Sequence, residues 1–149
     1  DTVHPSSWLR RIVEHFANQK AVCVFGPVKP GESGAVHKVV YAVTTNYMPR
    51  IAHAFGFEMA HGSNQAFRKS AFLKAGGYDE NLNVLEDNEL PNRMRRLGKV
   101  VFDPKMWVMS STRRFRKEGY FSTTSKFLAA YWNIYVKKKR KPVEYARYR

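Results

Sequence analysis

The chain reads GSNQAFRKSAF over residues 62–72, GGYDE over 76–80 and EDNEL over 86–90. The first segment joins small residues to a short apolar run, which is typical of a strand that approaches another group closely. The second segment is a glycine turn. The third places two carboxylates at the start of a helical pattern that includes Arg93 and stops at Gly98. These segments predict a strand, a turn and a helix in immediate succession.

Before and after this stretch, predicted helices and strands alternate along the chain. Helical spacing of apolar residues predicts helices over 7–18, 36–55, 69–74, 87–97 and 123–136. Pro49 is expected to break or kink the second of these helices. Short apolar runs predict strands over 21–28, 64–67, 100–102 and 107–109. This alternation favours an α/β layered fold, with a main unit over 1–120 and an aromatic helix with a basic tail over 121–149.

The composition is that of a folded protein with a strongly basic surface. The 149 residues are 44% hydrophobic and 14% aromatic, which allows a buried core and argues against a disordered chain. Lys and Arg total 26 against 12 Asp and Glu, for a net charge of +14. This charge favours anionic partners: nucleotide diphosphates, anionic lipid head groups or nucleic acid. A solvated basic surface without a partner is the simpler alternative.

The cysteine content and the lack of long apolar runs indicate the cellular compartment in which we expect the protein. Cys23 is the single cysteine and lies in an apolar run, so it is expected to be a buried thiol. A chain with one cysteine cannot form an internal disulfide, which is compatible with a reducing compartment. The sequence contains no run of about 18 apolar residues, and we expect no signal peptide. We expect a cytoplasmic protein, either dissolved or peripheral at the cytoplasmic face of a membrane.

The order of the three opening segments resembles the second half of the catalytic domain of family 2 glycosyltransferases. The shared features are the small-residue strand, a Gly-Gly-aromatic-Asp-Glu turn, and a Glu-Asp pair that opens a helix carrying Arg93. The resemblance implies a GT-A-like mixed sheet flanked by helices. It also implies transfer of a sugar from a nucleotide-sugar donor to the hydroxyl of a sugar or lipid-linked acceptor, with inversion.

Asp87 matches the general base of that family, the group that takes the proton from the attacking hydroxyl. Asp is also a favoured helix N-cap, and the two roles are compatible. Glu86 would orient or bind the substrate, or it is a surface charge. The resemblance places Gly62, Ser63 and Asn64 against the sugars, because small residues let the backbone approach a ligand. The alternative for these three is the tight start of a strand without ligand contact.

The donor side of the site is expected at Asp1 and in the loop that carries Arg113 and Arg114. In the family, an Asp-x-Asp motif binds a divalent metal and the nucleotide diphosphate, so Asp1 would be its last Asp and would bind Mn²⁺ or Mg²⁺. The two arginines would fold over the diphosphate, because guanidinium groups bind phosphate oxygens in pairs. A solvated basic loop is the alternative. The resemblance also implies that the nucleotide-binding strands precede Asp1, which leaves open whether this chain is active by itself.

The C-terminal segment combines an aromatic helix face with five successive basic residues over 137–141. This pattern suits an anionic membrane surface, or a helix that packs on the core and has a solvated basic end. A nucleic-acid-binding module is the alternative function, motivated by the charge. Because no zinc finger, helix-turn-helix or aromatic RNA-binding signature is present, nucleic acid is not the partner we expect. A glycosyltransferase-like remnant without activity is a third hypothesis, and homo-oligomerisation is left open.

Overall fold

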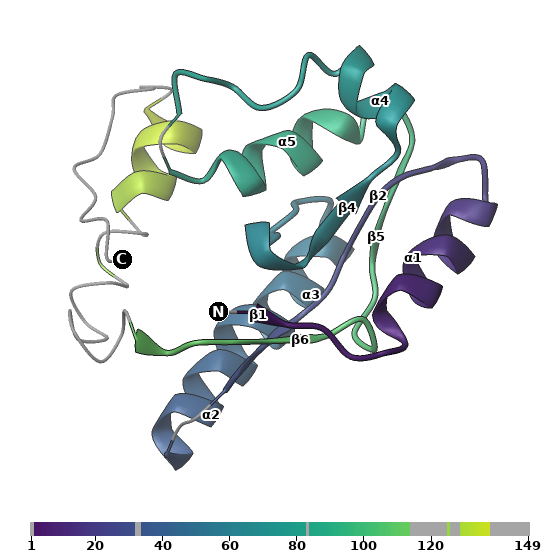
Figure 1. Cartoon of the computed structure of the whole chain (residues 1–149). Coiled ribbons are helices and arrows are strands. Elements are labelled where there is room, and N and C mark those ends of the chain that lie inside the picture. The colour runs from purple at the N-terminus through teal and green to yellow at the C-terminus, as the bar shows by residue number, and fades with distance from the viewer. Residues whose placement is uncertain (1, 32–33, 83, 114–124, 126–128, 138–149) are drawn as a thin grey trace.

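Two short sheets of three strands each lie at the centre of the molecule (Figure 1). In the first sheet, β2 (Ala21–Phe25) pairs antiparallel with β4 (Gln65–Phe67) and parallel with β5 (Lys99–Phe102). The computed structural model of the chain describes residues 2–31, 34–82, 84–113, 125 and 129–137. Predictions for Asp1, Arg114 and the basic residues 138–141 therefore lie outside the described residues.

In the second sheet, β6 (Val108–Ser110) pairs antiparallel with β1 (Thr2–Val3) and parallel with β3 (Val28–Pro30). Strand β3 follows β2 directly along the chain, and β6 likewise follows β5. The same two chain segments therefore run side by side through both sheets. The α/β class expected from the sequence is confirmed as a mixed fold with two small sheets flanked by helices.

The strand predicted over 21–28 is two strands, because the chain breaks at Gly26 and Pro27. The chain between β5 and β6 passes so close to Gly26 that a Cβ on Gly26 would lie 2.0 Å from the carbonyl oxygen of Met106. No other residue type fits such an approach without a shift of the backbone. The prediction of a buried strand in this run is confirmed by β2, whereas the separate strand β3 was not predicted, because its pairing with β6 joins segments far apart in the sequence.

Helices cover both faces of the first sheet. Every residue of β2 is buried, as expected for a strand with helices on each side. Val24 packs against Ile12 of α1 (Trp8–Ala17), whereas Cys23 and Phe25 pack in a separate cluster with Leu90 of α5 (Glu86–Met94). The predicted helix over 7–18 and the buried thiol of Cys23 are confirmed.

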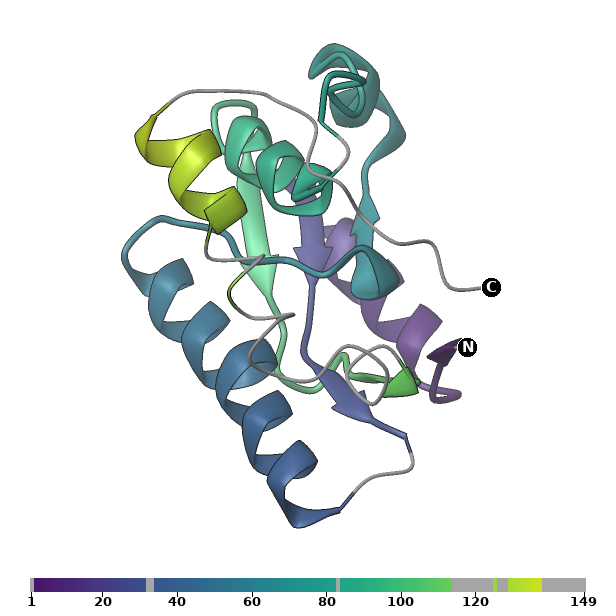
Figure 2. The same ribbon diagram turned by 90° about the vertical axis from the view of Figure 1, so that its left-hand side faces the viewer.

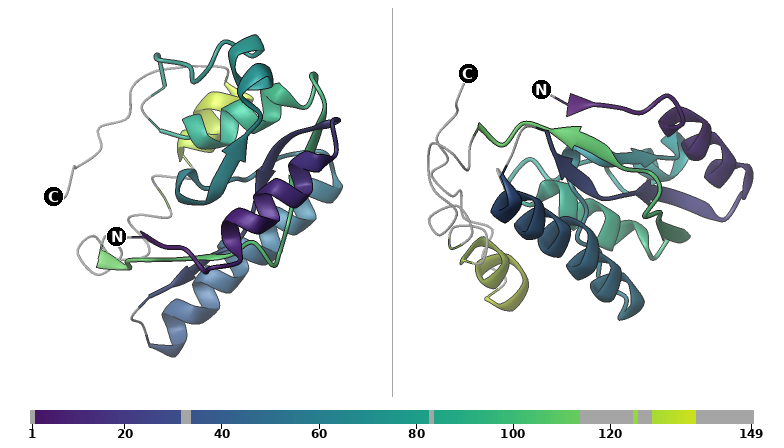
Figure 3. Two further views of the ribbon diagram at one scale, coloured as in Figure 1. Left: turned by 45° about the vertical axis from the view of Figure 1, so that its right-hand side comes forward. Right: turned by 90° about the horizontal axis from the view of Figure 1, so that it is seen from below.

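A long helical rod lies on the other side of the strands from α1 (Figure 3). It consists of α2 (Ala35–Ala42), a π-helical turn (Val43–Tyr47) and α3 (Met48–Ala54), and it runs without interruption (Figure 2). The helix does not break at Pro49, which is the second residue of α3, the helix that follows directly after the π-helical turn. The N–H of Met48 donates to the carbonyl of Val43, five residues back, and such a π-turn accommodates local irregularity without ending a helix.

Asp103, in the turn between β5 and β6, anchors α1 to the sheets. Its Oδ2 accepts hydrogen bonds from Arg11 Nη1 and His15 Nε2, each at 2.9 Å, and its Oδ1 accepts from the N–H of Lys105 at 2.8 Å. Burial by itself would raise the pKa of Asp103. The bonds from His15, Lys105 and Arg11 outweigh that effect and lower the pKa below its ordinary value.

The segment that leads to residues 62–64 is held by Glu58, which is fully buried. Its Oε2 lies 2.8 Å from His53 Nδ1, and its other oxygen accepts a hydrogen bond from Arg95. The side-chain amide of Asn92 on α5 bonds both the N–H and the carbonyl of Glu58, at 2.9 and 2.7 Å. These contacts fix the segment against α5 before it reaches the candidate site.

The predicted helix over 69–74 is confirmed as α4 (Lys69–Lys74). Its C-cap is Ala75, and the next residues, Gly76 and Gly77, have φ of 82° and 69°, left-handed values that favour glycine. Residues 129–136 are helical and end in a π-helical turn (Trp132–Val136), and Ala130 packs with Val84 and Leu85 just before α5. Among the described residues, no helix is long and apolar enough to cross a bilayer.

Candidate active site

Asp87 is the second residue of α5, not its N-cap. The N-cap is Leu85, which has the left-handed φ of 60° and makes no side-chain capping bond. A left-handed backbone at a residue other than glycine is strained and needs support from its surroundings. Leu85 is buried against Ala130 of the C-terminal helix, which provides that support. The N-cap alternative for Asp87 was therefore wrong, and its carboxylate is engaged elsewhere.

Both carboxylate oxygens of Asp87 are held by hydrogen-bond donors of the protein. The N–H of Gly62 donates to Oδ2 and the side-chain amide of Asn88 donates to Oδ1, each at 2.7 Å. The hydroxyl of Tyr131 in turn donates to Asn88 Oδ1 at 2.6 Å. Each carboxylate oxygen can accept more than one hydrogen bond, so the half-buried Asp87 retains acceptor capacity for a ligand hydroxyl.

Gly62 fits its place beside Asp87 because it has no side chain. A Cβ at Gly62 would lie 3.4 Å from Asp87 Oδ2, which is at the edge of tight contact. Gly62 and Ser63 are both exposed. Two of the predicted substrate-binding residues therefore lie at the surface, next to the predicted base.

Titratable side chains around Asp87 have displaced pKa values. Burial raises the pKa of Glu86, and the negative charge of Asp87 adds to this increase. Burial lowers the pKa of His61, although the charge of Asp87 opposes that decrease. Burial, followed by the charges of Asp87 and Glu86, raises the pKa of Tyr78. Such clusters of displaced pKa values are common at functional sites.

Asn64 is not available to a sugar, contrary to the prediction for it. Its side chain is fully buried, and its Nδ2 donates to the carbonyls of Pro27 at 2.9 Å and Met106 at 2.7 Å. Its Oδ1 accepts a hydrogen bond from the indole N–H of Trp8 at 2.9 Å. Both amide hydrogens are thus used within the protein, so the role of Asn64 is architectural.

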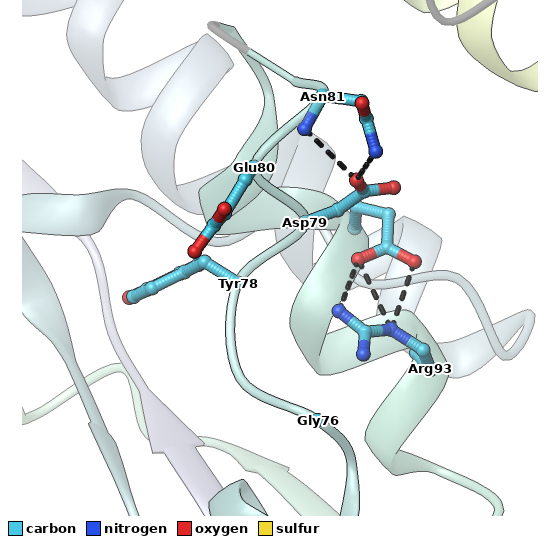
Figure 4. A pocket seen from close by; sticks show the side chains of 7 residues that line it. Gly76, Tyr78, Asp79, Glu80, Asn81 and Arg93 are labelled. Carbon is cyan, nitrogen blue, oxygen red and sulfur yellow. Dashed lines mark hydrogen bonds and ion pairs between the residues drawn. The ribbon is translucent and has the colours of Figure 1, made fainter.

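Arg93, the arginine of the sequence pattern, holds the glycine turn. Its guanidinium pairs with Glu89 at 2.8 Å and donates to the carbonyls of Ala75 and Gly77. A pocket of about 420 Å³ opens between this turn and α5 (Figure 4). It is lined by polar and charged residues, namely Gly76, Tyr78, Asp79, Glu80, Asn81, Glu89 and Arg93.

Described neighbours of the predicted donor-side residues adjoin the segment that carries Gly62. Thr2, the residue after Asp1, pairs with Ser110 of β6, and β6 contacts the short 3₁₀ helix Gly62–Asn64. Arg113 is half-buried and lies three residues after Ser110. The ends of β1 and β6 are therefore brought to the same region as the segment that donates to Asp87.

The described residues do not by themselves assemble a metal site. No group of three or more His, Cys, Asp or Glu side chains suited to a metal ion occurs within the part of the chain that the structure describes. The predicted ligand, Asp1, lies outside that part. We therefore derive no chemical step through a metal ion.

The sequence interpretation missed the pairing of Asn88 with Tyr131. Asn88 belongs to the EDNEL segment and Tyr131 to the aromatic helix predicted over 123–136, and neither position indicates the other. They are 43 positions apart. No periodicity or motif links residues across such a separation, so only the folded chain could reveal this contact.

A scan of the chain against known protein-family models finds no match, and neither does a search of curated proteins. The fold and the site define a mixed α/β protein with a carboxylate held near the surface at the start of a helix. Its activity must therefore be argued from the site.

Proposed function

We propose that this chain is the acceptor-side part of a GT-A-like glycosyltransferase and that Asp87 is the general base. The observation that carries the proposal is the carboxylate of Asp87, fixed at both oxygens by Gly62 and Asn88 and half-buried beside the exposed Gly62 and Ser63. A general base must have a fixed position within reach of the hydroxyl that it deprotonates. The order of sequence segments over residues 62–96 supports the same reaction class.

In the proposed step, Asp87 takes the proton of the acceptor hydroxyl as that oxygen attacks the anomeric carbon of the donor sugar. The new carbon–oxygen bond forms while the bond from that carbon to the diphosphate breaks. The nucleoside diphosphate leaves with the electron pair, and the configuration at the anomeric carbon inverts. Gly62 and Asn88 contribute by preventing rotation of the carboxylate during this transfer.

Arg113 is proposed to bind the diphosphate. Its guanidinium is suited to the negative charge that grows on the leaving group. The pairing of Thr2 with Ser110 supports this role, because it brings Thr2 close to the segment that carries Arg113. Arg114 and Asp1 are proposed as further donor-side residues on the sequence resemblance alone.

The decisive experiment replaces Asp87 by Asn in the natural gene product that contains this chain. Release of nucleoside diphosphate would be measured with a panel of nucleotide-sugars, in the presence of Mn²⁺ or Mg²⁺. Asn keeps the shape and can still accept from the Gly62 N–H, but it cannot take a proton. We expect kcat to fall by about 10²–10⁴-fold, the usual contribution of a general base.

Glu14→Gln is the matched control, because it also neutralises one carboxylate but lies exposed on α1 in a pair with Arg10. This variant should retain the turnover of the parent protein. Undiminished turnover in Asp87→Asn would refute the assignment of the base. If no nucleotide-sugar is turned over or raises the melting temperature of the parent protein, the chain is a remnant with the fold but without the activity.

A further inference from the structure

The outward face of the α2–α3 rod carries an unusually apolar surface, which we call the outer stripe. Seven large apolar side chains on this rod and at its end are between 42% and 87% exposed. They are Val36, Val39, Val43, Tyr47, Met48, Ile51 and Phe55. Single exposed apolar residues are common on proteins, but a continuous series along one helix marks an interaction surface.

The outer stripe is additional to the face by which the rod packs on the protein. Tyr41, Thr45 and Pro49 recur every four residues and are buried. The hydroxyl of Thr45 lies 2.5 Å from the carbonyl oxygen of Val28 and so joins the rod to β3. The rod is therefore apolar on two sides, and its inner side already accounts for the packing that holds it in the fold.

The charges on the rod have one sign. Residues 35–54 contain Lys38 and Arg50 but no Asp or Glu. Both cations are exposed, and among the described residues no carboxylate pairs with either of them. The whole chain has a net charge of +14. A partner for the outer stripe must therefore be apolar where it meets the stripe and negatively charged around it.

We infer that the outer stripe lies in the headgroup region of a membrane that contains anionic lipids, with the rod parallel to the membrane plane. A helix with apolar side chains on the outward face and cations beside them has the composition of an interfacial helix. Its 20 residues would extend over about 30 Å of the membrane surface. A second copy of the chain fits less well, because pairing two such faces would bring only cations together.

The first test measures binding to phosphatidylcholine vesicles prepared with and without phosphatidylglycerol. We expect the protein to sediment with the anionic vesicles only, and this binding to weaken as salt is added. The combined variant Val36→Gln, Val39→Gln and Ile51→Gln leaves the net charge unchanged and introduces a good helix-forming residue at each position. It should weaken binding by roughly tenfold or more. The matched control Leu9→Gln with Val13→Gln removes two similarly exposed apolar residues from α1 and should bind like the parent.

A second test locates the inserted face directly. A nitroxide label is attached through Val43→Cys on the outer stripe, or through Val13→Cys on α1 as the control. Cys23 does not interfere, because its side chain is fully buried. With anionic vesicles, the label at position 43 should become accessible to oxygen and protected from a water-soluble relaxation agent, while the label at position 13 should remain in water.

Two outcomes would overturn the inference. Equal vesicle binding by the parent and the outer-stripe variant would mean that the basic charge binds lipid without the stripe. A concentration-dependent dimer that protects the label at position 43 in the absence of lipid would assign the stripe to a second copy. Neither test needs turnover, so failure of the proposed glycosyl transfer would leave both tests valid.

Discussion

Asn64 connects three parts of the molecule that are distant in sequence. Its Nδ2 donates to the carbonyl of Pro27, between β2 and β3, and to the carbonyl of Met106, between β5 and β6. Its Oδ1 accepts a hydrogen bond from the indole N–H of Trp8, the first residue of α1. Loss of a hydrogen-bond donor to a buried backbone carbonyl destabilises the folded protein, because water cannot replace that donor. The side chain of Asn64 therefore stabilises both connections between the two sheets, the one from β2 to β3 and the one from β5 to β6.

Asn64→Asp should destabilise the protein by about 3 kcal/mol or more, because a carboxylate would face two carbonyl oxygens without a hydrogen to donate. The free energy of unfolding can be measured by urea denaturation. Ser63→Ala, at the exposed neighbouring position, should change it by no more than about 0.5 kcal/mol. Equal stability of Asn64→Asp and the parent protein would show that Asn64 does not have this structural role.

The interruptions between β2 and β3 and between β5 and β6 determine where the first sheet ends and the second begins. Gly26 lies against the backbone of Asp103 and Met106, and Pro27 follows it without an N–H to continue the strand. The break lets β3 pair with β6 in a second sheet instead of extending the first one. That second pairing is what brings Ser110 and the residues after it toward the candidate site.

Gly26→Ala should cost about 3 kcal/mol of unfolding free energy, because the added methyl group would meet main-chain atoms that cannot rotate away. Gly34→Ala offers a matched control, since a Cβ at Gly34 meets no atom within 4 Å. Because Gly34 is the N-cap of α2, where Gly is preferred to Ala, the stability of this variant should fall by no more than about 1 kcal/mol. Thermal unfolding of the three proteins side by side would check this, and similar melting temperatures would contradict the close approach at Gly26.

For the whole molecule, the question is whether the two sheets unfold together. They share two continuous chain segments, and Asp103 additionally ties α1 to the turn between them. Shared segments favour one cooperative transition, because opening one sheet removes support from the other. Cys23 is a suitable probe, since it lies fully buried in β2 and burial raises the pKa of its thiol.

Labelling of Cys23 by a thiol reagent should be at least about 10³-fold slower in the native protein than in denaturant. If β2 is exposed only by global unfolding, Gly26→Ala should accelerate native-state labelling by roughly a hundredfold, in proportion to its lost stability. An unchanged rate in Gly26→Ala would instead mean that β2 opens locally. The reaction can be followed by absorbance during a titration with low concentrations of urea.

Features that depend on near neighbours follow from the amino-acid sequence alone. Helical spacing predicted α1, the glycine pair at 76–77 predicted the end of α4, and the apolar run around Cys23 predicted a buried thiol. These features are local, because periodicity and turn geometry act within a few residues. The order of the segments over 62–96 also singled out Asp87, although its position alone suited an N-cap.

The tertiary structure decided which long-range contacts each of these residues makes. It engaged Asp87 with Gly62 across 25 positions, used the amide of Asn64 inside the protein, and split the predicted strand at Gly26. It also left the second apolar side of the rod exposed, which periodicity alone could not show. The physical reason is that hydrogen-bond partners and burial depend on which distant segments meet, and a single sequence does not state these pairings.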